Sequence, residues 1–123
     1  MLITGGTGFL GSAVQRALAP LNPAEVLTPT SAECDLRDPV ATDALFTRTA
    51  PDLVIHLAAR VGGIGANRER PGDLYIDNLL IGTHVIDAAR RHEVAKTVAV
   101  GTTCSSPKIT PVPFQETSLW TGY

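Results

Sequence analysis

The fold class is decided by residues 1–11, which read Met1-Leu2-Ile3-Thr4-Gly5-Gly6-Thr7-Gly8-Phe9-Leu10-Gly11. The first four residues are mostly apolar and predict a short strand that runs into a glycine-rich turn. Apolar residues at helical spacing then predict a helix from Phe9 to Ala19, which Pro20 ends. The three glycines at 5, 8 and 11 are therefore expected at a strand–helix junction.

Each of these glycines has a reason in the chemistry of dinucleotide binding. Gly5 permits a sharp turn, Gly8 lets the backbone approach a pyrophosphate, and Gly11 lets the helix pack closely against the strand. The N-terminus of the helix offers free N–H groups to an anion. A tight turn without a ligand is the alternative interpretation. The turn predicts these cofactor-binding residues: Gly5, Gly6, Thr7, Gly8, Phe9, Leu10 and Gly11.

Strands and helices are predicted to alternate along the rest of the chain. Further strands are expected at 25–28, 52–59 and 96–101, helices at 39–49 and 71–92, and an irregular stretch at 61–70. Such alternation is typical of a right-handed parallel α/β fold. We expect part of a Rossmann-type doubly wound sheet, with strand order 3-2-1-4 and helices on both faces. The last strand is expected to be buried, with one free edge.

Composition narrows the functional classes. The 123 residues hold 10 basic and 12 acidic side chains, so no strongly charged surface for nucleic acid or an anionic membrane is expected. No apolar run is long enough for a transmembrane helix, and Met1 is not followed by a secretory signal. Cys34 and Cys104 do not form a disulfide framework, and no spacing of His and Cys predicts a metal site. A cytoplasmic location is the default expectation.

Two further segments are candidates for contact with a nucleotide. Asp35 and Leu36 follow the second predicted strand, where a carboxylate can reach the adenosine end of a cofactor. Asp38 precedes Pro39 and is equally well explained as a helix cap. The third predicted strand ends in small or apolar residues, which would either let the cofactor lie across the strand ends or simply pack in the core: Leu57, Ala58 and Ala59.

Together these motifs resemble the extended short-chain dehydrogenase/reductase family, and within it the GDP-L-fucose synthases. The more specific elements are Ala58-Ala59-Arg60-Val61-Gly62-Gly63-Ile64, Asn78, Gly101-Thr102-Thr103-Cys104 and Pro107-Lys108. The resemblance implies that residues 1–123 are the N-terminal part of an NAD(P)-binding domain whose substrate lobe is absent. It also implies a nucleotide-sugar substrate and a homodimeric parent enzyme.

The activity implied by the resemblance is the conversion of GDP-4-keto-6-deoxy-D-mannose to GDP-L-fucose, by epimerisation and then reduction with NADPH. Cys104 would be the proton-transfer base, and Thr102 would hydrogen-bond the sugar C4 oxygen. Lys108 would approach the substrate, and Asn78 would help order the active site. Val100, Gly101 and Thr103 would line the cofactor. A small buried hydrophobic residue is the ordinary alternative for a lone cysteine such as Cys104.

Two departures from the family pattern leave alternatives open. Only Tyr75 and Tyr123 could supply the family's Tyr-x-x-x-Lys pair, and Leu79 stands where Tyr75 would need its lysine. These 123 residues are therefore expected to lack reductase activity, and the pair is expected soon after Tyr123. No local arginine selects NADP(H) over NAD(H). Another extended nucleotide-sugar epimerase or dehydratase, or a non-catalytic nucleotide-binding module, are the alternative functions.

Overall fold

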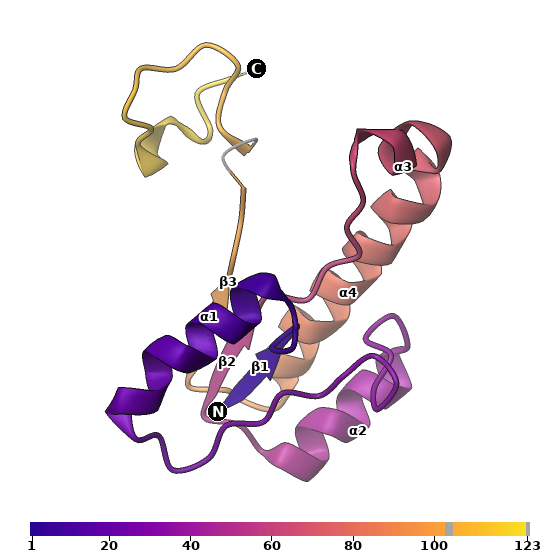
Figure 1. The fold of residues 1–123 in the computed structure, drawn as a ribbon, viewed down its shortest axis with the longest axis vertical. Coiled ribbons are helices and arrows are strands. Elements are labelled where there is room, and N and C mark those ends of the chain that lie inside the picture. Colours follow the sequence, from indigo (N-terminus) through magenta and orange to yellow (C-terminus); the bar gives the residue numbers. More distant parts are fainter. Residues whose placement is uncertain (103–104, 123) are drawn as a thin grey trace.

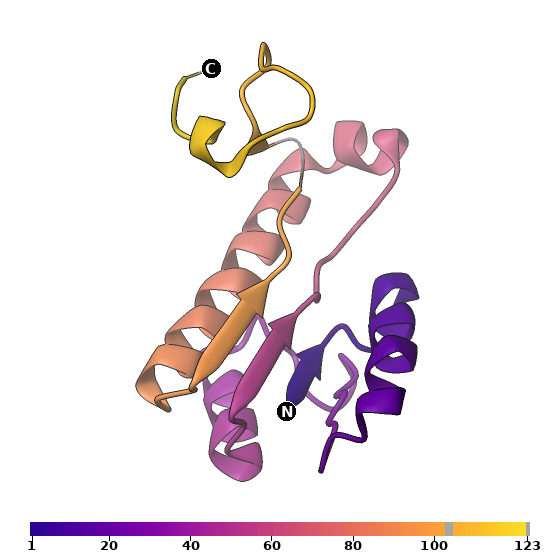
Figure 2. The same ribbon diagram turned by 90° about the vertical axis from the view of Figure 1, so that its left-hand side faces the viewer.

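The fold is built on a small parallel sheet. The computed structural model describes residues 1–102 and 105–122. Three strands, β1 (Leu2–Thr4), β2 (Leu53–His56) and β3 (Lys96–Ala99), lie in the order β1-β2-β3. In the register, Ile55 lies between Ile3 and Val98. Figure 2 shows the three arrows pointing the same way, so their carboxyl ends meet at one edge of the sheet.

The expected strand order of 3-2-1-4 is wrong. The third predicted strand became β2 and pairs directly with β1, while the predicted strand at 25–28 makes a single bridge, from Leu27 to Leu2. Pro23 and Pro29 flank this segment and have no N–H to donate, which limits a longer ladder. The apolar run of β2 instead takes the central position, where it has a neighbour on each edge.

Helices cover both faces of the sheet, as expected for a doubly wound α/β fold. In Figure 1, α1 lies on one side of the strands, and α2 and α4 lie on the other. None of the helices in residues 1–102 and 105–122 is long and apolar enough to cross a membrane. The helical elements are α1 (Phe9–Leu18), η1 (Ala19–Leu21), α2 (Pro39–Thr49), α3 (Ile64–Glu69), α4 (Pro71–Arg91) and η3 (Glu116–Ser118).

The core lies between the sheet and the α2/α4 layer. Side chains alternate across β2, where Val54 and His56 are buried while Leu53 and Ile55 are only half-buried. This alternation shows that one face of the sheet is covered more completely than the other. The main cluster of fully buried side chains consists of Leu2, Leu45, Phe46, Val54, Val85 and Ala88.

Two local predictions differ from the structure. The stretch at 61–70 was expected to be irregular, but it contains the six-residue helix α3. Gly63 caps α3, and the Asn67 side chain holds its first turn by donating to the carbonyls of Gly62 and Gly63 at 3.0 and 3.1 Å. The strand predicted at 96–101 ends at Ala99. It lies at the edge of the sheet as expected, but the prediction that it is buried is wrong, because all four of its residues are exposed.

Candidate nucleotide-binding site

The glycine turn after β1 packs directly on the end of β2. Gly5 has a φ of +70°, and a Cβ atom there would lie 2.7 Å from the backbone nitrogen of Ala58. The Thr4 carbonyl accepts a hydrogen bond of 3.0 Å from the Leu57 N–H, which fixes this contact. A side chain at position 5 would therefore be both strained and blocked by backbone. The structure thus brings the turn together with the predicted site residues at the end of β2.

Gly11 lets helix α1 sit on the turn itself. A Cβ atom at Gly11 would lie 2.3 Å from the Gly5 carbonyl oxygen and 2.4 Å from that of Gly6. The Gly8 N–H also donates to the Gly5 carbonyl at 3.1 Å. The sequence predicted that Gly11 would bring the helix close to the strand. In the structure, the contact that requires glycine at position 11 is between helix α1 and the backbone carbonyls of the turn, rather than between the helix and the strand.

The outer part of the turn is open to solvent. Thr7, Gly8, Phe9 and Leu10 are all exposed, and the Phe9 side chain is 98% exposed. Gly8 is the N-cap of α1, and no side chain caps this end of the helix. The first backbone N–H groups of a helix lack partners within it and favour negative charge. This accessible end of α1 fits the pyrophosphate of a dinucleotide.

A polar pair, Thr4 and His56, lies buried beside the glycine turn. The Thr4 hydroxyl and the His56 Nδ1 lie 2.6 Å apart, and the Ala58 N–H donates to the same Thr4 oxygen at 3.4 Å. Burial lowers the pKa of His56, so its imidazole is neutral at pH 7. The Thr4 hydroxyl has one proton and two lone pairs, so it can accept from Ala58 and still pair with either tautomer of the neutral imidazole. His56 is thus a structural support beneath Gly5 and Ala58.

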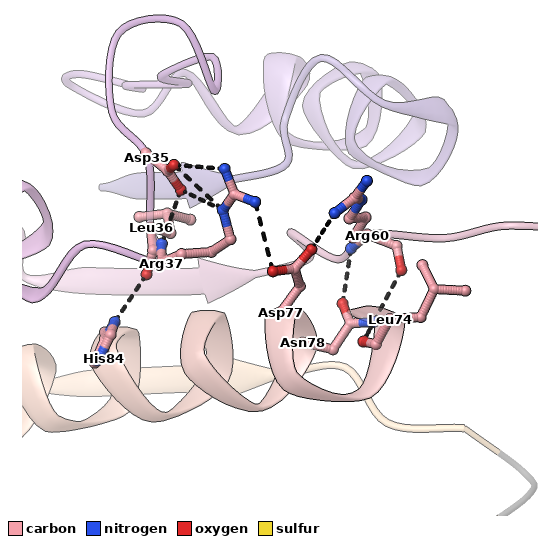
Figure 3. Close-up of polar contacts among 8 residues, drawn as sticks. All are labelled: Asp35, Leu36, Arg37, Arg60, Leu74, Asp77, Asn78 and His84. Atoms are coloured by element: carbon pink, nitrogen blue, oxygen red, sulfur yellow. Dashed lines mark hydrogen bonds and ion pairs between the residues drawn. The ribbon is translucent and has the colours of Figure 1, made fainter. Parts of the chain in front are cut away.

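Asp35 is held by its neighbour Arg37. Its Oδ1 accepts from the Arg37 backbone N–H at 3.0 Å and from the Arg37 Nε at 2.9 Å, while its Oδ2 accepts from Nη2 at 2.7 Å. These hydrogen bonds lower the pKa of Asp35 to about 2. The Leu36 carbonyl lies 3.1 Å from the Nδ1 of His84 on α4. The carboxylate expected near the adenosine is therefore ionised and fixed in place (Figure 3).

Asp38 serves as the N-cap of α2. Its Oδ1 accepts from the Val40 N–H at 2.8 Å, and Pro39 occupies the first helical turn. This is the helix-cap role that the sequence left open for Asp38.

The sequence interpretation did not assign any role to three charged residues at the site, Arg37, Arg60 and Asp77. Asp77 on α4 lies between the two arginines, and its hydrogen bond from Arg60 lowers its pKa. Asp77 falls on the buried face of α4, three residues after Leu74. A carboxylate on an apolar helical stripe is almost always paired, and this position was the signal that could have revealed the contact.

Asn78 holds the chain where it leaves β2. Its Oδ1 accepts from the Arg60 N–H at 2.7 Å, and its Nδ2 donates to the Arg60 carbonyl at 2.8 Å. The same Nδ2 also donates to the Leu74 carbonyl at 2.8 Å. Ala59, immediately before this contact, is exposed, while Leu57 and Ala58 are half-buried. Asn78 therefore orders the segment that follows β2, and its part in ordering an active site stays a prediction.

The remaining predicted residues lie beyond the end of β3. The Val100 N–H donates to the His56 carbonyl at 3.2 Å, and Val100, Gly101 and Thr102 are exposed. Thr103 and Cys104 lie outside the described residues. Lys108 is exposed on the segment 105–122, which Figure 1 shows in gold beyond the end of β3. Within the described part of the chain, no group of His, Cys, Asp and Glu could hold a metal ion.

Known proteins are similar to this chain in sequence and in fold. The probable GDP-L-fucose synthase 1 of Oryza sativa subsp. japonica is 39% identical, covering 99% of this chain and 38% of that protein. The solved structure of a protein named DdhaC is 33% identical with a TM-score of 0.92, covering 99% of this chain and 35% of that one. A GDP-L-fucose synthetase from Naegleria fowleri bound to NADP is 30% identical with a TM-score of 0.82, covering 98% and 36%.

The chain therefore spans between a third and two fifths of the length of these relatives. The sequence pattern of one family matches residues 1–122, which is nearly the whole chain. That match covers the glycine turn, the strand ends and the α4 contacts described above. The chain belongs to the NAD dependent epimerase/dehydratase family.

Proposed function

We propose that the chain binds NADP(H) and forms the cofactor-binding part of a nucleotide-sugar epimerase/reductase of the GDP-L-fucose synthase kind. The observation that carries the proposal is the glycine turn, which packs on β2 through Gly5 and leaves the end of α1 open at Gly8. The substrate, GDP-4-keto-6-deoxy-D-mannose, is the one that the resemblance to the GDP-L-fucose synthases implies, and a relative carrying that name supports it.

The described residues have distinct tasks in cofactor binding. The N-terminus of α1 would hold the pyrophosphate, with Gly8 allowing its close approach. Asp35, held by Arg37, would face the adenosine side. The end of β2 would lie beneath the rest of the cofactor, because ligands of this fold class bind beyond the carboxyl ends of the strands. When bound, NADPH supplies the hydride that reduces the sugar ketone.

Two residues after β3 are proposed to act on the sugar. The Thr102 hydroxyl would donate a hydrogen bond to the C4 oxygen, and the Cys104 thiolate would remove a proton from the carbon next to the ketone. A carbonyl acidifies the adjacent C–H bonds, so a thiolate is a sufficient base if its pKa is lowered. Lys108 would approach the nucleotide-sugar, and Val100, Gly101 and Thr103 would line the cofactor.

Titration with NADPH, followed by nucleotide fluorescence, tests the cofactor site. Gly8→Ala places a Cβ atom at the open end of α1, and we expect the Kd to rise at least about tenfold, or 1.4 kcal/mol. Gly72→Ala is the matched control, because a Cβ atom there meets nothing within 4 Å. Failure of the unaltered chain to bind NADPH, or an unchanged Kd in Gly8→Ala, would contradict the proposal.

Cofactor choice is tested by the same titration with NADH. We infer NADP(H) from the relative bound to NADP, and we expect NADPH to bind more tightly than NADH. Equal or tighter binding of NADH would assign NAD(H) instead.

We also infer that an enzyme built on this cofactor-binding part is a homodimer. The outward face of α4 supports this, because Tyr75, Leu79 and Ile86 on it are 69%, 48% and 53% exposed. A groove lined by Leu79, Gly82 and Ile86 runs along this face. Sedimentation of that enzyme should give the mass of a dimer, and sedimentation of its Ile86→Glu variant should give the mass of a monomer. A monomeric unaltered protein would contradict this inference.

A further inference from the structure

A single carboxylate on α4 joins two arginines from separate loops. The Asp77 Oδ1 accepts from Arg37 Nη1 at 3.4 Å, and its Oδ2 accepts from Arg60 Nη1. The Asp77 side chain is only 11% exposed, whereas those of both arginines are 44% exposed. Figure 3 shows both guanidinium groups reaching toward Asp77 from opposite sides. Asp77 therefore links the loop before α2 to the loop that leaves β2.

The first of these links leads to the adenosine side of the site. The Arg37 guanidinium bridges Asp35 and Asp77, so it is fixed at both ends. The fork of an arginine pairs with a carboxylate in one plane, and this pairing makes the contact directional. Asp35 and Asp77 do not touch, but both contact the Arg37 guanidinium, which joins them.

The second link leads to the glycine turn. Arg60 is held by Asp77 through its side chain and by Asn78 through both groups of its peptide. Arg60 follows Ala59 directly, and Gly5 packs against the backbone of Ala58. The segment that follows β2, on which the glycine turn packs at Ala58, is therefore tied to the same two residues of α4.

We propose that Asp77 is a positioning residue for the cofactor, setting the spacing between the Asp35 carboxylate and the glycine turn through Arg37 and Arg60. This inference rests on the proposed function, because the spacing matters only if one ligand contacts both places. A dinucleotide held at its adenosine and at its pyrophosphate loses affinity when the two contacts no longer match it.

A purely electrostatic role of Asp77 and a positioning role predict opposite changes in the affinity for NADPH, so the two roles can be distinguished. The group comprises two carboxylates and two guanidiniums, so Asp77→Asn makes it more positive. A more positive site attracts an anionic cofactor more strongly. Electrostatics alone therefore predicts tighter NADPH binding in Asp77→Asn, whereas loss of positioning predicts weaker binding.

The experiment is a titration of the full chain with NADPH, with the unfolding midpoint measured in parallel. We expect Asp77→Asn to raise the Kd about tenfold. Asp87→Asn is the matched control: Asp87 lies on the same helix and also pairs with two arginines, Arg90 and Arg91. It should leave the Kd within twofold of the unaltered chain. The double variant Arg37→Gln/Asp77→Asn should raise the Kd by clearly less than the product of the two single effects, because both substitutions break the same link.

Hydrogen exchange reports the link without any ligand. In Asp77→Asn we expect faster exchange of backbone amides at 35–37 and at 57–62, whereas Asp87→Asn should leave both segments unchanged. An unchanged or lower Kd in Asp77→Asn, or an equal effect of Asp87→Asn, would overturn the positioning role. If the unaltered chain bound no NADPH, both the proposed function and the role of Asp77 in binding would be refuted. If the unaltered chain bound NADPH and Asp77→Asn left the Kd unchanged, only the role of Asp77 would be refuted.

Discussion

Gly11→Ala is the substitution whose cost the structure defines most sharply. The new Cβ atom would lie 2.3 Å from the Gly5 oxygen and 2.4 Å from the Gly6 oxygen, about 1 Å inside the 3.4 Å at which ordinary contact begins. Both obstacles are backbone atoms, and Gly5 is itself held by contact with Ala58. The clash therefore has no flexible side chain that could move away.

The two opposing energies can be weighed. Overpacking against a rigid neighbour costs about 3 kcal/mol, the upper end of the usual range. Alanine gains about 1 kcal/mol over glycine within a helix. The net loss of stability is about 2 kcal/mol, which lowers the melting temperature of a domain of this size by about 8 °C.

The assay is thermal and urea unfolding followed by circular dichroism, with NADPH titration at a temperature where the variant is folded. Gly72→Ala, which places a Cβ atom in open space on α4, should leave stability unchanged or raise it by up to about 1 kcal/mol. We expect Gly11→Ala also to weaken NADPH binding, because α1 must move away from the turn. If Gly11→Ala were as stable as the unaltered chain, the close approach of α1 to the turn would be refuted.

Four other outcomes are expected. Burial lowers the pKa of His56, so below about pH 6.5 the unfolded chain binds more protons than the folded chain, and the free energy of unfolding should fall as the pH falls. Urea unfolding at a series of pH values should show a smaller dependence on pH in His56→Gln than in the unaltered chain. An equal dependence in both would refute this role of His56. Asp38→Ala removes the N-cap of α2 and should cost about 1 kcal/mol in urea unfolding, whereas no loss would exclude a capping contribution. The exposed edge strand β3 should cause concentration-dependent association visible by light scattering, and Val98→Lys should reduce it; a monodisperse unaltered chain would argue against this. In a protein that carries these residues together with the Tyr-x-x-x-Lys pair, Cys104→Ala should abolish deuterium exchange at C3 and C5 of the keto sugar while NADPH still binds, and retained exchange would reject Cys104 as the base.

The glycine turn could be predicted from the sequence because its requirements are local. Gly5 must adopt a positive φ, and the alternation of short apolar runs with helical periodicity places the turn after a strand. The boundaries of α2 were predicted correctly for the same reason, since Asp38 and Pro39 start it and Pro51 follows its end. These signals act within a few residues and do not depend on the rest of the fold.

Strand order and burial could not be predicted in the same way. The apolar sequence of β3 predicted a buried strand with one free edge; β3 does lie at the edge of the sheet, but every one of its residues is exposed. The segment around Leu27 contributes one bridge beside β1 rather than a strand. Which neighbours a strand finds depends on the packing of the whole sheet, and a short apolar run is compatible with several positions.

The sequence by itself therefore determined the α/β class, the strand–helix junction at the glycine turn and the bounds of α2, because each rests on backbone conformation and local periodicity. Only the tertiary structure decided that β1 pairs with β2, that Gly11 is required by the carbonyls of the turn, and that Asp35 is linked through Arg37 and Asp77 to Arg60. These contacts join residues far apart in the chain. Their energy arises from close approach and from charges sharing a partly buried site, which no spacing along the sequence encodes.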